Sequence, residues 1–413
     1  MKFHKLLLTA FVCILALVGC AHDPHPQMNQ DFLHETWMRT VNLNPMLWTR
    51  GADRWFFTGE PNATESAAHN APGDKAISLT SVKVTQFSNI EINGCFQVQL
   101  TSAEGRNSIT ILGPNEKSRQ ILVEAQGDTV IISQPIDPKT GMANLKDVIV
   151  RINVQNLHQL KVKGAVNVEG RLLVSNGLSI YANDQGNVLL SGTINLQKVD
   201  NTGPGAVSVL NTYTPCLTVI NRGNGIVNAS GRVGIQTISN LTNGAVHIIG
   251  ADTRSLQINA CGNSRTSVAG YANLRKLNAT GNACVHLYWI NSDAASVYLN
   301  GNAHVGLAGC MGSLELLAIG NSRFGGQYLQ VESVYAQTKN NAHANVTGRK
   351  RIFASAINTS SIYYFGASGN VSRYTQNEAI VIPVWSATSA PPVPAYAPQF
   401  VTTMNNLGVV HRY

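Results

Sequence analysis

The residues between 281 and 326 repeat a short pattern three times. They read GNACVHLYWINSDAASVYLN (281–300), GNAHVGLAGCMGSLELLAI (301–319) and GNSRFGG (320–326). Each segment opens with a turn residue followed by asparagine, and then alternates small or apolar residues with polar ones. Alternation with a period of two is typical of a β-strand that is buried on one side. The repeat therefore predicts short strands that recur at intervals of about 20 residues.

The same pattern extends in both directions along the chain. Turn positions recur at Gly164, Gly186, Gly205, Gly225, Gly244, Gly262, Gly281, Gly301, Gly320 and Asn340. Residues two and four positions after each turn are small or apolar, as at Val246 and Val305, so we expect them to point into a common interior. Coils of this kind, stacked ~4.8 Å apart, make an all-β, single-stranded parallel β-helix, or β-solenoid. We expect right-handed winding, the rule for parallel crossovers.

Asparagines directly follow many of the turns. Asparagine tolerates left-handed backbone conformations, and its amide can hydrogen-bond to the same residue in the next coil. We interpret these residues as a structural turn ladder, formed by Asn187, Asn263, Asn282, Asn302, Asn321 and Asn341.

A polar column separates the two inward positions and supplies the candidate ligand-binding ladder, His247, Arg265, His304, Arg323 and His343. Stacked coils would align these side chains, with Cys284 in the same row and His286 two positions along. One interpretation is a linear site for an anionic polymer or for the acidic edge of a partner protein. The alternative is an ordinary solvent-exposed face. We expect no metal site here, because residues of alternate coils lie too far apart to share one ion.

The chain between Phe87 and Gly170 carries a series of related strand patterns. These are F-x-x-I-x-I-x-G from Phe87, I-L-G at 111–113, G-D-T-V-I-I at 127–132, and V-I-V-x-I-x-V-x-N-L-x-x-L-x-V-x-G-A at 148–165. This series resembles the head GIN domain family of auto-transporter adhesins, and the repeats after residue 170 continue it more loosely. The resemblance implies an exported bacterial β-helix, often a lipoprotein, with no established catalytic residues to carry over.

The first 19 residues predict a signal peptide of the lipoprotein type. Lys2 and Lys5 precede an apolar run from Leu6 to Val18, which is too short for a stable membrane span. The run ends in Leu-Val-Gly-Cys at 17–20, which resembles a lipobox, so we expect cleavage before Cys20 and acylation (palmitate among the acyl chains) of that residue. An ordinary secretory signal is the alternative. Ala21 stands where aspartate would retain a lipoprotein at the inner membrane, so we expect a lipid anchor in the outer membrane.

Four segments follow from these patterns: the signal peptide (1–19), a lipidated arm (20–76), the β-helix (77–372) and a proline-rich tail (373–413). The arm is rich in aromatic residues, and we take five of them as candidates for partner docking; the alternative is that they pack against the solenoid. They are Trp37, Trp48, Trp55, Phe56 and Phe57. The tail is expected to end the stacking, since proline cannot donate to a strand ladder, or to serve as an extended ligand.

The composition of the chain limits the classes of partner that it is expected to bind. Without Lys2 and Lys5 the chain has 28 basic and 22 acidic side chains, a weak preference for anionic partners. Basic runs with interleaved aromatic residues are missing, so nucleic acid is not expected. Once Cys13 is cleaved and Cys20 is acylated, five cysteines remain without C-x-x-C spacing, and we interpret them as small buried hydrophobic residues: Cys95, Cys216, Cys261, Cys284 and Cys310.

Catalysis is not expected. Glycoside hydrolysis needs two carboxylates close together on one face, whereas Asp184, Asp200, Asp252 and Asp293 fall in different connecting segments. We therefore expect a non-catalytic outer-membrane lipoprotein, anchored by the lipid on Cys20 and without other cofactors, that binds a glycan or a protein partner. The alternative is a structural or accessory subunit of an envelope assembly such as a secretion system. A polysaccharide-cleaving β-helix enzyme is the least supported alternative.

Overall fold

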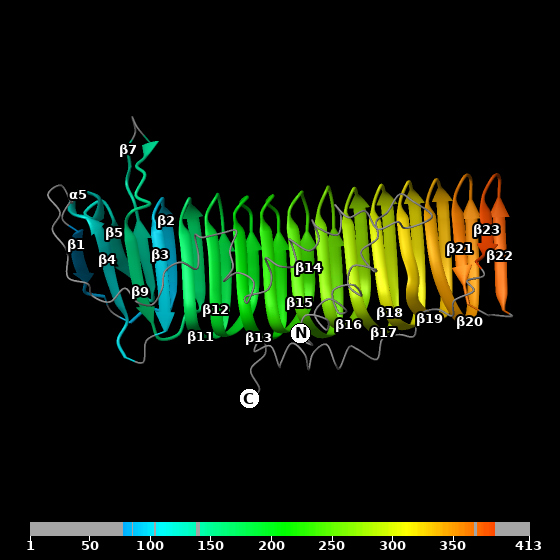
Figure 1. Ribbon diagram of the computed structural model, residues 1–413, viewed down its shortest axis with the longest axis horizontal. Helices are drawn as coiled ribbons and strands as arrows, with labels where there is room; N and C mark the ends of the chain where they lie inside the picture. The colour runs from blue at the N-terminus through cyan, green and yellow to red at the C-terminus, as the bar shows by residue number, and fades with distance from the viewer. Residues whose placement is uncertain (1–76, 85, 103–104, 138–140, 367–369, 385–413) are drawn as a thin grey trace, which may run out of the picture. The chain divides into compact units, whose positions relative to one another are not determined.

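The computed structural model describes residues 77–384, apart from 85, 103–104, 138–140 and 367–369. These residues form a β-solenoid of about 12 turns whose neighbouring strands are mostly parallel (Figure 1), as the sequence predicts. One short helix, α5 (Asn115–Ser118), lies near the N-terminal end of this described part. Each long strand of the body is one coil of the solenoid, and its register partners in the next coil lie 17–20 residues away, as in the pairs Cys284–His304 and His343–Ser361.

Ten strands, each of 15 to 18 residues, make the regular body. They are β11 (Asn167–Ala182), β12 (Asn187–Asn201), β13 (Ala206–Asn221), β14 (Ile226–Asn240), β15 (Ala245–Ala260), β16 (Arg265–Gly281), β17 (Cys284–Gly301), β18 (His304–Gly320), β19 (Arg323–Asn340) and β20 (His343–Ile357).

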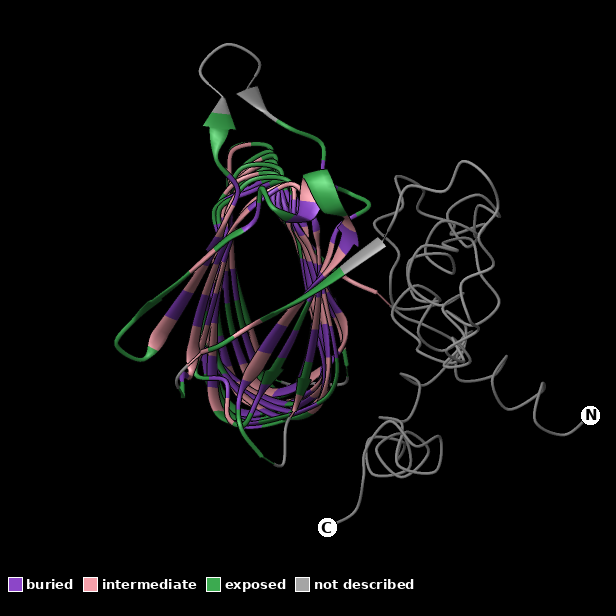
Figure 2. Ribbon diagram, turned by 90° about the vertical axis from the view of Figure 1, so that its left-hand side faces the viewer, coloured by how far each residue is buried: buried purple, intermediate pink, exposed green. Residues whose placement is uncertain are grey.

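Every coil bends once, so that it contributes to two long sides of the solenoid. In β17, residues 284–288 lie on one side, which we name face A, and residues 296–299 lie on the other, face B. The bend requires unusual backbone conformations. Gly309, for example, has a φ of +136°, and a Cβ there would come within 2.2 Å of the Ile290 carbonyl oxygen. Viewed end-on in Figure 2, the buried residues line the interior of both sides.

The interior is a continuous stack of aliphatic side chains. Val246 and Val305, which the alternation assigns to the interior, are 0% and 3% exposed. Both lie in the same inward row of face A, which contains Val188, Val207, Val227, Val246, Thr266, Val285, Val305, Phe324 and Ala344. Burying aliphatic surface contributes about 25 cal/mol per Å². The stacking of these rows therefore stabilises the coils collectively.

The register differs from the predicted one by two residues in part of the chain. Gly262 stacks on Thr242, whereas Gly244 stacks on Gly225, so these two glycines occupy different rows of the same turn. The cause is a turn with two positions that can hold glycine, as in Gly203-x-Gly205, and most coils have glycine at one or both of them. Gly164 likewise aligns with Asp184 and not with Gly186. Because the shift is even, inward and outward positions are unchanged.

The N-terminal coils do not stack in the order of the sequence. The strands concerned are β2 (Asn89–Gly94), β3 (Gln97–Ser102), β6 (Thr129–Ser133), β9 (Ile149–Val154) and β10 (Gln159–Gly164). On face B, β2 lies between β6 and β10, and on face A, β3 lies between β9 and β11. The first coil is therefore enclosed by two coils that follow it in the chain.

The two ends of the solenoid are built differently. At the N-terminal end, antiparallel strands cover the last parallel ones: β1 (Ile77–Val82) and β4 (Ser108–Pro114) on face A, and β5 (Leu122–Gln126) on face B. A small hairpin of β7 (Ile136–Asp137) and β8 (Gly141–Met142) projects nearby. At the C-terminal end, β21 (Ser361–Phe365), β22 (Val371–Gln376) and β23 (Ile380–Pro383) continue the parallel stacking.

These last strands correct a predicted boundary. The expected end of the β-helix at residue 372 falls inside β22, and β23 extends the solenoid to Pro383. The prediction weighted the prolines too strongly. Pro383 is the last residue of its strand, where a missing N–H group does not interrupt the ladder.

Candidate functional site

The candidate ladder lies on the outer surface of face A. Register pairs place Arg265, Cys284, His304, Arg323 and His343 next to one another in five successive coils. The structure thus brings together four of the five predicted ladder residues, with Cys284 between them as expected.

His247 belongs to the adjacent row. Its register partner is Ser267, not Arg265, because the shift of two residues at the Gly262 turn moves it along the strand. His286 lies in this second row as well, after Ser267. We name the two rows together the Arg–His strip; the second row consists of His247, Ser267, His286, Gly306, Gly325 and Asn345.

The strip contains no acidic residue. From β12 to β23, the segments that form face A have neither aspartate nor glutamate. Several acids elsewhere on the solenoid form ion pairs, among them Asp200–Arg222 (2.6 Å) and Asp252–Arg232 (2.7 Å). Arg265 and Arg323 are exposed and lie three coils apart, about 14 Å at the usual strand spacing. The strip therefore presents positive charge with no carboxylate on the face A segments of its coils.

The histidines of the strip are held by local hydrogen bonds. His247 Nδ1 lies 2.7 Å from Ser267 Oγ, and His343 Nδ1 lies 2.8 Å from Ser361 Oγ. Burial lowers the pKa of His343, and the charge of Arg323 acts in the same direction, against a hydrogen bond with Asn345 that raises it. This shift favours the neutral form of His343, which can both donate and accept hydrogen bonds.

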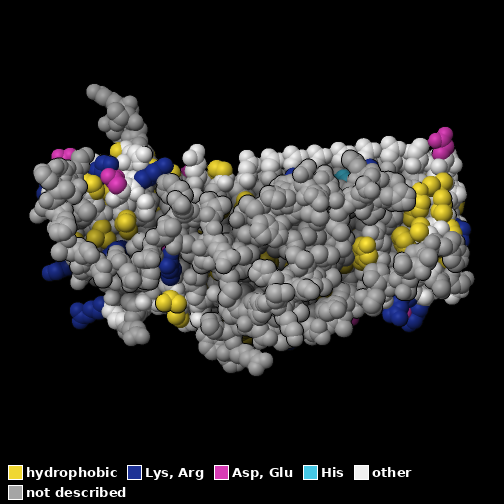
Figure 3. Space-filling view, in the orientation of Figure 1, with side chains coloured by type: hydrophobic (Ala, Val, Ile, Leu, Met, Phe, Trp, Pro, Cys, Tyr) yellow, Lys and Arg dark blue, Asp and Glu magenta, His cyan; other side chains and the backbone are white. Residues whose placement is uncertain are grey.

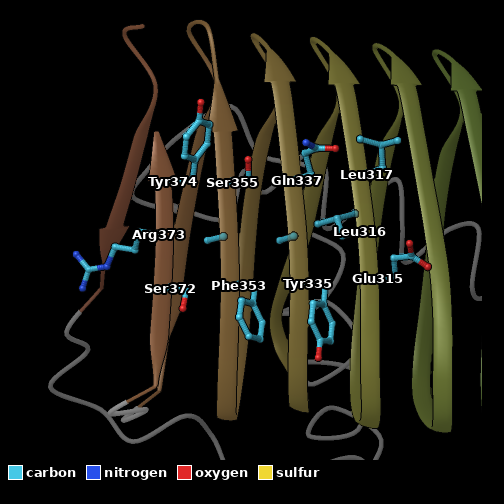
Figure 4. A pocket seen from close by; sticks show the side chains of 12 residues that line it. Glu315, Leu316, Leu317, Tyr335, Gln337, Phe353, Ser355, Ser372, Arg373 and Tyr374 are labelled. Carbon is cyan, nitrogen blue, oxygen red and sulfur yellow. The ribbon is translucent and has the colours of Figure 1, made fainter. Parts of the chain in front are cut away.

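A second surface lies on face B at the C-terminal end of the solenoid. It is a shallow depression of about 420 Å³ (Figure 4), which we name the aromatic groove. Its outward-facing rows are Glu315, Tyr335, Phe353 and Ser372, and beside them Leu317, Gln337, Ser355 and Tyr374. The Tyr335 and Phe353 rings are nearly parallel, with an interplanar angle of 4° and centroids 5.0 Å apart.

This groove was not among the predicted sites. Exposed large apolar residues concentrate in the last coils, among them Tyr335, Phe353, Tyr374, Ile380 and Ile382. Hydrophobic side chains also gather at this end in the view of Figure 3. The signal was present in the second strand of each coil, where Tyr335 and Phe353 occupy the same outward position. The predicted register covered only the strand after each turn.

Two rows of asparagines run along the solenoid. In the exposed row, Asn263, Asn282, Asn302, Asn321 and Asn341 form amide–amide hydrogen bonds of 2.7–3.1 Å with their neighbours, and Asn243 and Asn224 extend it. Asn187 is not part of this row and donates to Asn167 at 3.0 Å. The second row was not predicted: Asn201, Asn221 and Asn240 are fully buried and hydrogen-bonded to each other and to turn carbonyls.

The acidic residues do not converge. Asp200 and Asp252 lie in the ion pairs above, Asp293 pairs with Arg275, and Asp184 accepts a hydrogen bond from the Gly164 amide. Within the described part of the chain, no group of three or more His, Cys, Asp or Glu side chains is placed to hold a metal ion.

The five cysteines form no disulfide with one another. The prediction that they are buried is wrong, because Cys216 is exposed and the other four are only half-buried. Cys284 and Cys310 both lie at outward or bend positions of their coils, where neighbouring coils cover only part of each side chain.

The remaining predicted residues lie outside the described residues. These are the lipidation site Cys20 and the docking candidates Trp37, Trp48, Trp55, Phe56 and Phe57. No helix among residues 77–384, as far as they are described, has the length and apolarity needed to cross a bilayer.

Comparison with known families identifies the first half of the solenoid. Residues 86–275 match the family described as "Putative auto-transporter adhesin, head GIN domain", so this segment of the solenoid is similar to that family. The resemblance seen between residues 87 and 170 is thus confirmed and extends into the regular repeats. The search of curated proteins found no match to this sequence.

Solved structures with detectable similarity are distant. One is described as a "putative lipid binding protein" from Parabacteroides distasonis, with 12% identity, 75% of this chain and 97% of that chain covered, and a TM-score of 0.28. Another is a "putative adhesin" from Bacteroides fragilis, with 15% identity, 75% and 98% coverage, and a TM-score of 0.25.

Proposed function

We propose that this protein is a non-catalytic, adhesin-like β-solenoid that binds an anionic polymer along the Arg–His strip of face A. The observation that carries the proposal is the acid-free outer surface of face A from β12 to β23, on which Arg265 and Arg323 lie in one straight row with His304 between them. The adhesin-like family of residues 86–275 agrees with a binding role.

A row of this geometry suits an extended ligand. Register repeats the side chains at each coil, so a linear polymer lying along the axis meets a cation or a hydrogen-bonding group at every step of ~4.8 Å. Sulfate, phosphate and carboxylate groups are the natural partners of arginine, whose guanidinium donates two parallel hydrogen bonds. Because the strip is exposed, salt should weaken the interaction.

The absence of catalysis is part of the proposal. The acids that a hydrolase would need are each beside a base or a backbone amide, as for Asp200 with Arg222 and Asp184 with Gly164. These two carboxylates therefore already have partners within the solenoid. None of the acids discussed above is placed opposite a second one across an open surface.

The strip is tested by reversing its charge. The full-length variant Arg265→Glu/Arg323→Glu should lose at least about tenfold of its affinity for immobilised heparin and for purified lipopolysaccharide at moderate salt. The matched control is Arg254→Glu/Lys276→Glu, which makes the same change of charge at exposed positions outside the strip. The proposal requires the control to keep most of its affinity. Equal loss in both variants would show a general effect of net charge and would refute the strip.

We further propose that a lipid on Cys20 anchors the protein in the outer membrane, with the solenoid as the exported part. The Leu-Val-Gly-Cys sequence at 17–20 supports this. Cells fed a labelled fatty acid should incorporate label into the wild-type chain and not into Cys20→Ser. Recovery of the Cys20→Ser chain in the outer-membrane fraction at the wild-type level would contradict the anchor.

A further inference from the structure

We propose that the aromatic groove of face B is a second binding site, for a neutral sugar ring that stacks on Phe353. This site differs from the Arg–His strip in face, in residues and in ligand chemistry, and it does not depend on the strip being functional.

The aromatic stack ends one coil before the solenoid does. One side of the Phe353 ring packs against Tyr335, with a centroid distance of 5.0 Å. On the other side, the next residue of the same row is Ser372, whose side chain is too small to cover the ring. Phe353 is 42% exposed as a result. The row therefore leaves room over Ser372 for one more ring of about the thickness of a coil, ~4.8 Å.

The surroundings of this space fit a sugar. An aromatic ring has a negative face, and the C–H bonds on one side of a pyranose present a weakly positive, apolar surface to it. The edge of a pyranose carries hydroxyl groups, for which the groove offers the hydroxyls of Ser355, Ser372 and Tyr374 and the amide of Gln337 (Figure 4). A volume of about 420 Å³ lies in the range of small-molecule sites.

The charges of the groove favour a neutral ligand over an anionic one. Glu315 lies at one end and Arg373 at the other, so the two opposite charges flank the site. The Arg373 guanidinium is already placed over the Tyr364 ring, 5.1 Å from its centroid. A protein partner is less well matched, since a stable protein interface buries about 800 Å² on each side, far more than this depression provides.

The site is also accessible from the end of the solenoid. Within the described residues, β22 is the last strand of face B, and Tyr374 on this strand is 56% exposed. A sugar over Ser372 would have Phe353 on one side and no further coil of the described part of the chain on the other. This arrangement suits the terminal residue of an oligosaccharide.

Saturation-transfer NMR on the full-length protein tests the site, in a detergent without a sugar headgroup. Cellobiose, maltose and N,N′-diacetylchitobiose serve as probes. At least one should receive saturation, most strongly at the axial C–H protons of one ring. Phe353→Ala removes the platform, and Ser372→Leu covers it without removing an aromatic residue. Each should reduce the transfer by about fivefold or more, whereas Tyr213→Ala, which removes an exposed tyrosine outside the groove, should not.

Two results would overturn the inference: no transfer to any of the three probes from the wild-type protein, or undiminished transfer in both Phe353→Ala and Ser372→Leu. Heparin binding measured on the same variants separates this site from the strip. If Phe353→Ala still binds heparin while sugar transfer is lost, the two sites are independent, as proposed. Loss of heparin binding in that variant would contradict the separation.

Discussion

Faces A and B of the solenoid have similar interiors and different exteriors. Inward positions on both faces are aliphatic, such as Val305 on face A and Val297 on face B. From β12 to β23, outward positions on face A include arginine, histidine and serine and no acids, whereas face B carries ion pairs such as Glu91–Lys163 and, near its end, the aromatic groove. The comparison shows that the inward residues determine the coil, while the outward residues vary freely along the same strands.

In strands of this kind, different residues provide stability and ligand contacts. Neighbouring residues of one strand point to opposite sides, so stability and ligand contact are assigned to alternate positions. The stack also makes each outward row straight, because parallel register repeats from coil to coil. A binding surface can therefore change without a change in the fold.

The largest expected effect comes from charging an inward residue. Val305→Asp places a carboxylate in a dry interior with no basic partner, which should cost several kcal/mol, about 4 or more, and disrupt adjacent coils. His304→Asp, one residue away on the outer side, should change stability by only about 0.5 kcal/mol. Urea unfolding measured by circular dichroism compares the two. Similar losses in both variants would break the distinction between inward and outward positions.

The two asparagine rows give a smaller contrast within one residue type. Asn221 is fully buried and donates to the Gly225 carbonyl and to Asn240, so Asn221→Ala leaves buried partners unsatisfied and should cost about 1–3 kcal/mol. Asn302 makes equivalent amide bonds at the surface, where water replaces them, and Asn302→Ala should cost about 0.5 kcal/mol. Equal costs would mean that burial does not distinguish the rows.

His343 gives a pH-dependent difference on face A. Its pKa is lowered from the ordinary 6.5, so the folded protein binds this proton less readily than the unfolded chain does. Its contribution to stability is therefore present above pH 6.5 and is lost as the pH falls from there towards the lower pKa of the folded state. Between pH 7.5 and 5, the melting temperature of His343→Gln should fall by a few degrees less than that of the wild type. An identical pH dependence in the two proteins would contradict this assignment.

The smallest expected effect is that of the charge-reversed strip on stability. Arg265 and Arg323 are exposed, and surface substitutions usually stay within about 0.5 kcal/mol. The urea concentration at the midpoint of unfolding should therefore be the same for Arg265→Glu/Arg323→Glu as for the wild type, although the variant binds heparin poorly. A large loss of stability would mean that the strip has a structural role.

The fold was predictable because its signal is repeated many times. Alternation placed Val246 and Val305 inside, and a period of about 20 residues identified the solenoid. The exact register was not predictable from the glycines, since Gly244 and Gly262 occupy different rows of the same turn. Because the shift is an even number of residues, inward residues remain inward. The predicted burial pattern was therefore right, although His247 was assigned to the wrong row.

Two other features lay beyond sequence patterns. The enclosure of β2 and β3 between later coils depends on which strands pair over long separations, and alternation is the same for any order of stacking. The aromatic groove depends on Phe353 being followed in its row by the small Ser372. That neighbour is visible only when the second strand of each coil is in register.

Cysteine cross-linking tests the central claim, that outward residues of successive coils form straight rows in the register described here. In a chain whose native cysteines other than Cys20 are replaced by serine, His247→Cys/Ser267→Cys should form a disulfide on mild oxidation, since register partners lie within the usual Cα separation of 4.4–6.8 Å. His247→Cys/Arg265→Cys should not. Rapid cross-linking of the second pair and none of the first would contradict the register and, with it, the Arg–His strip.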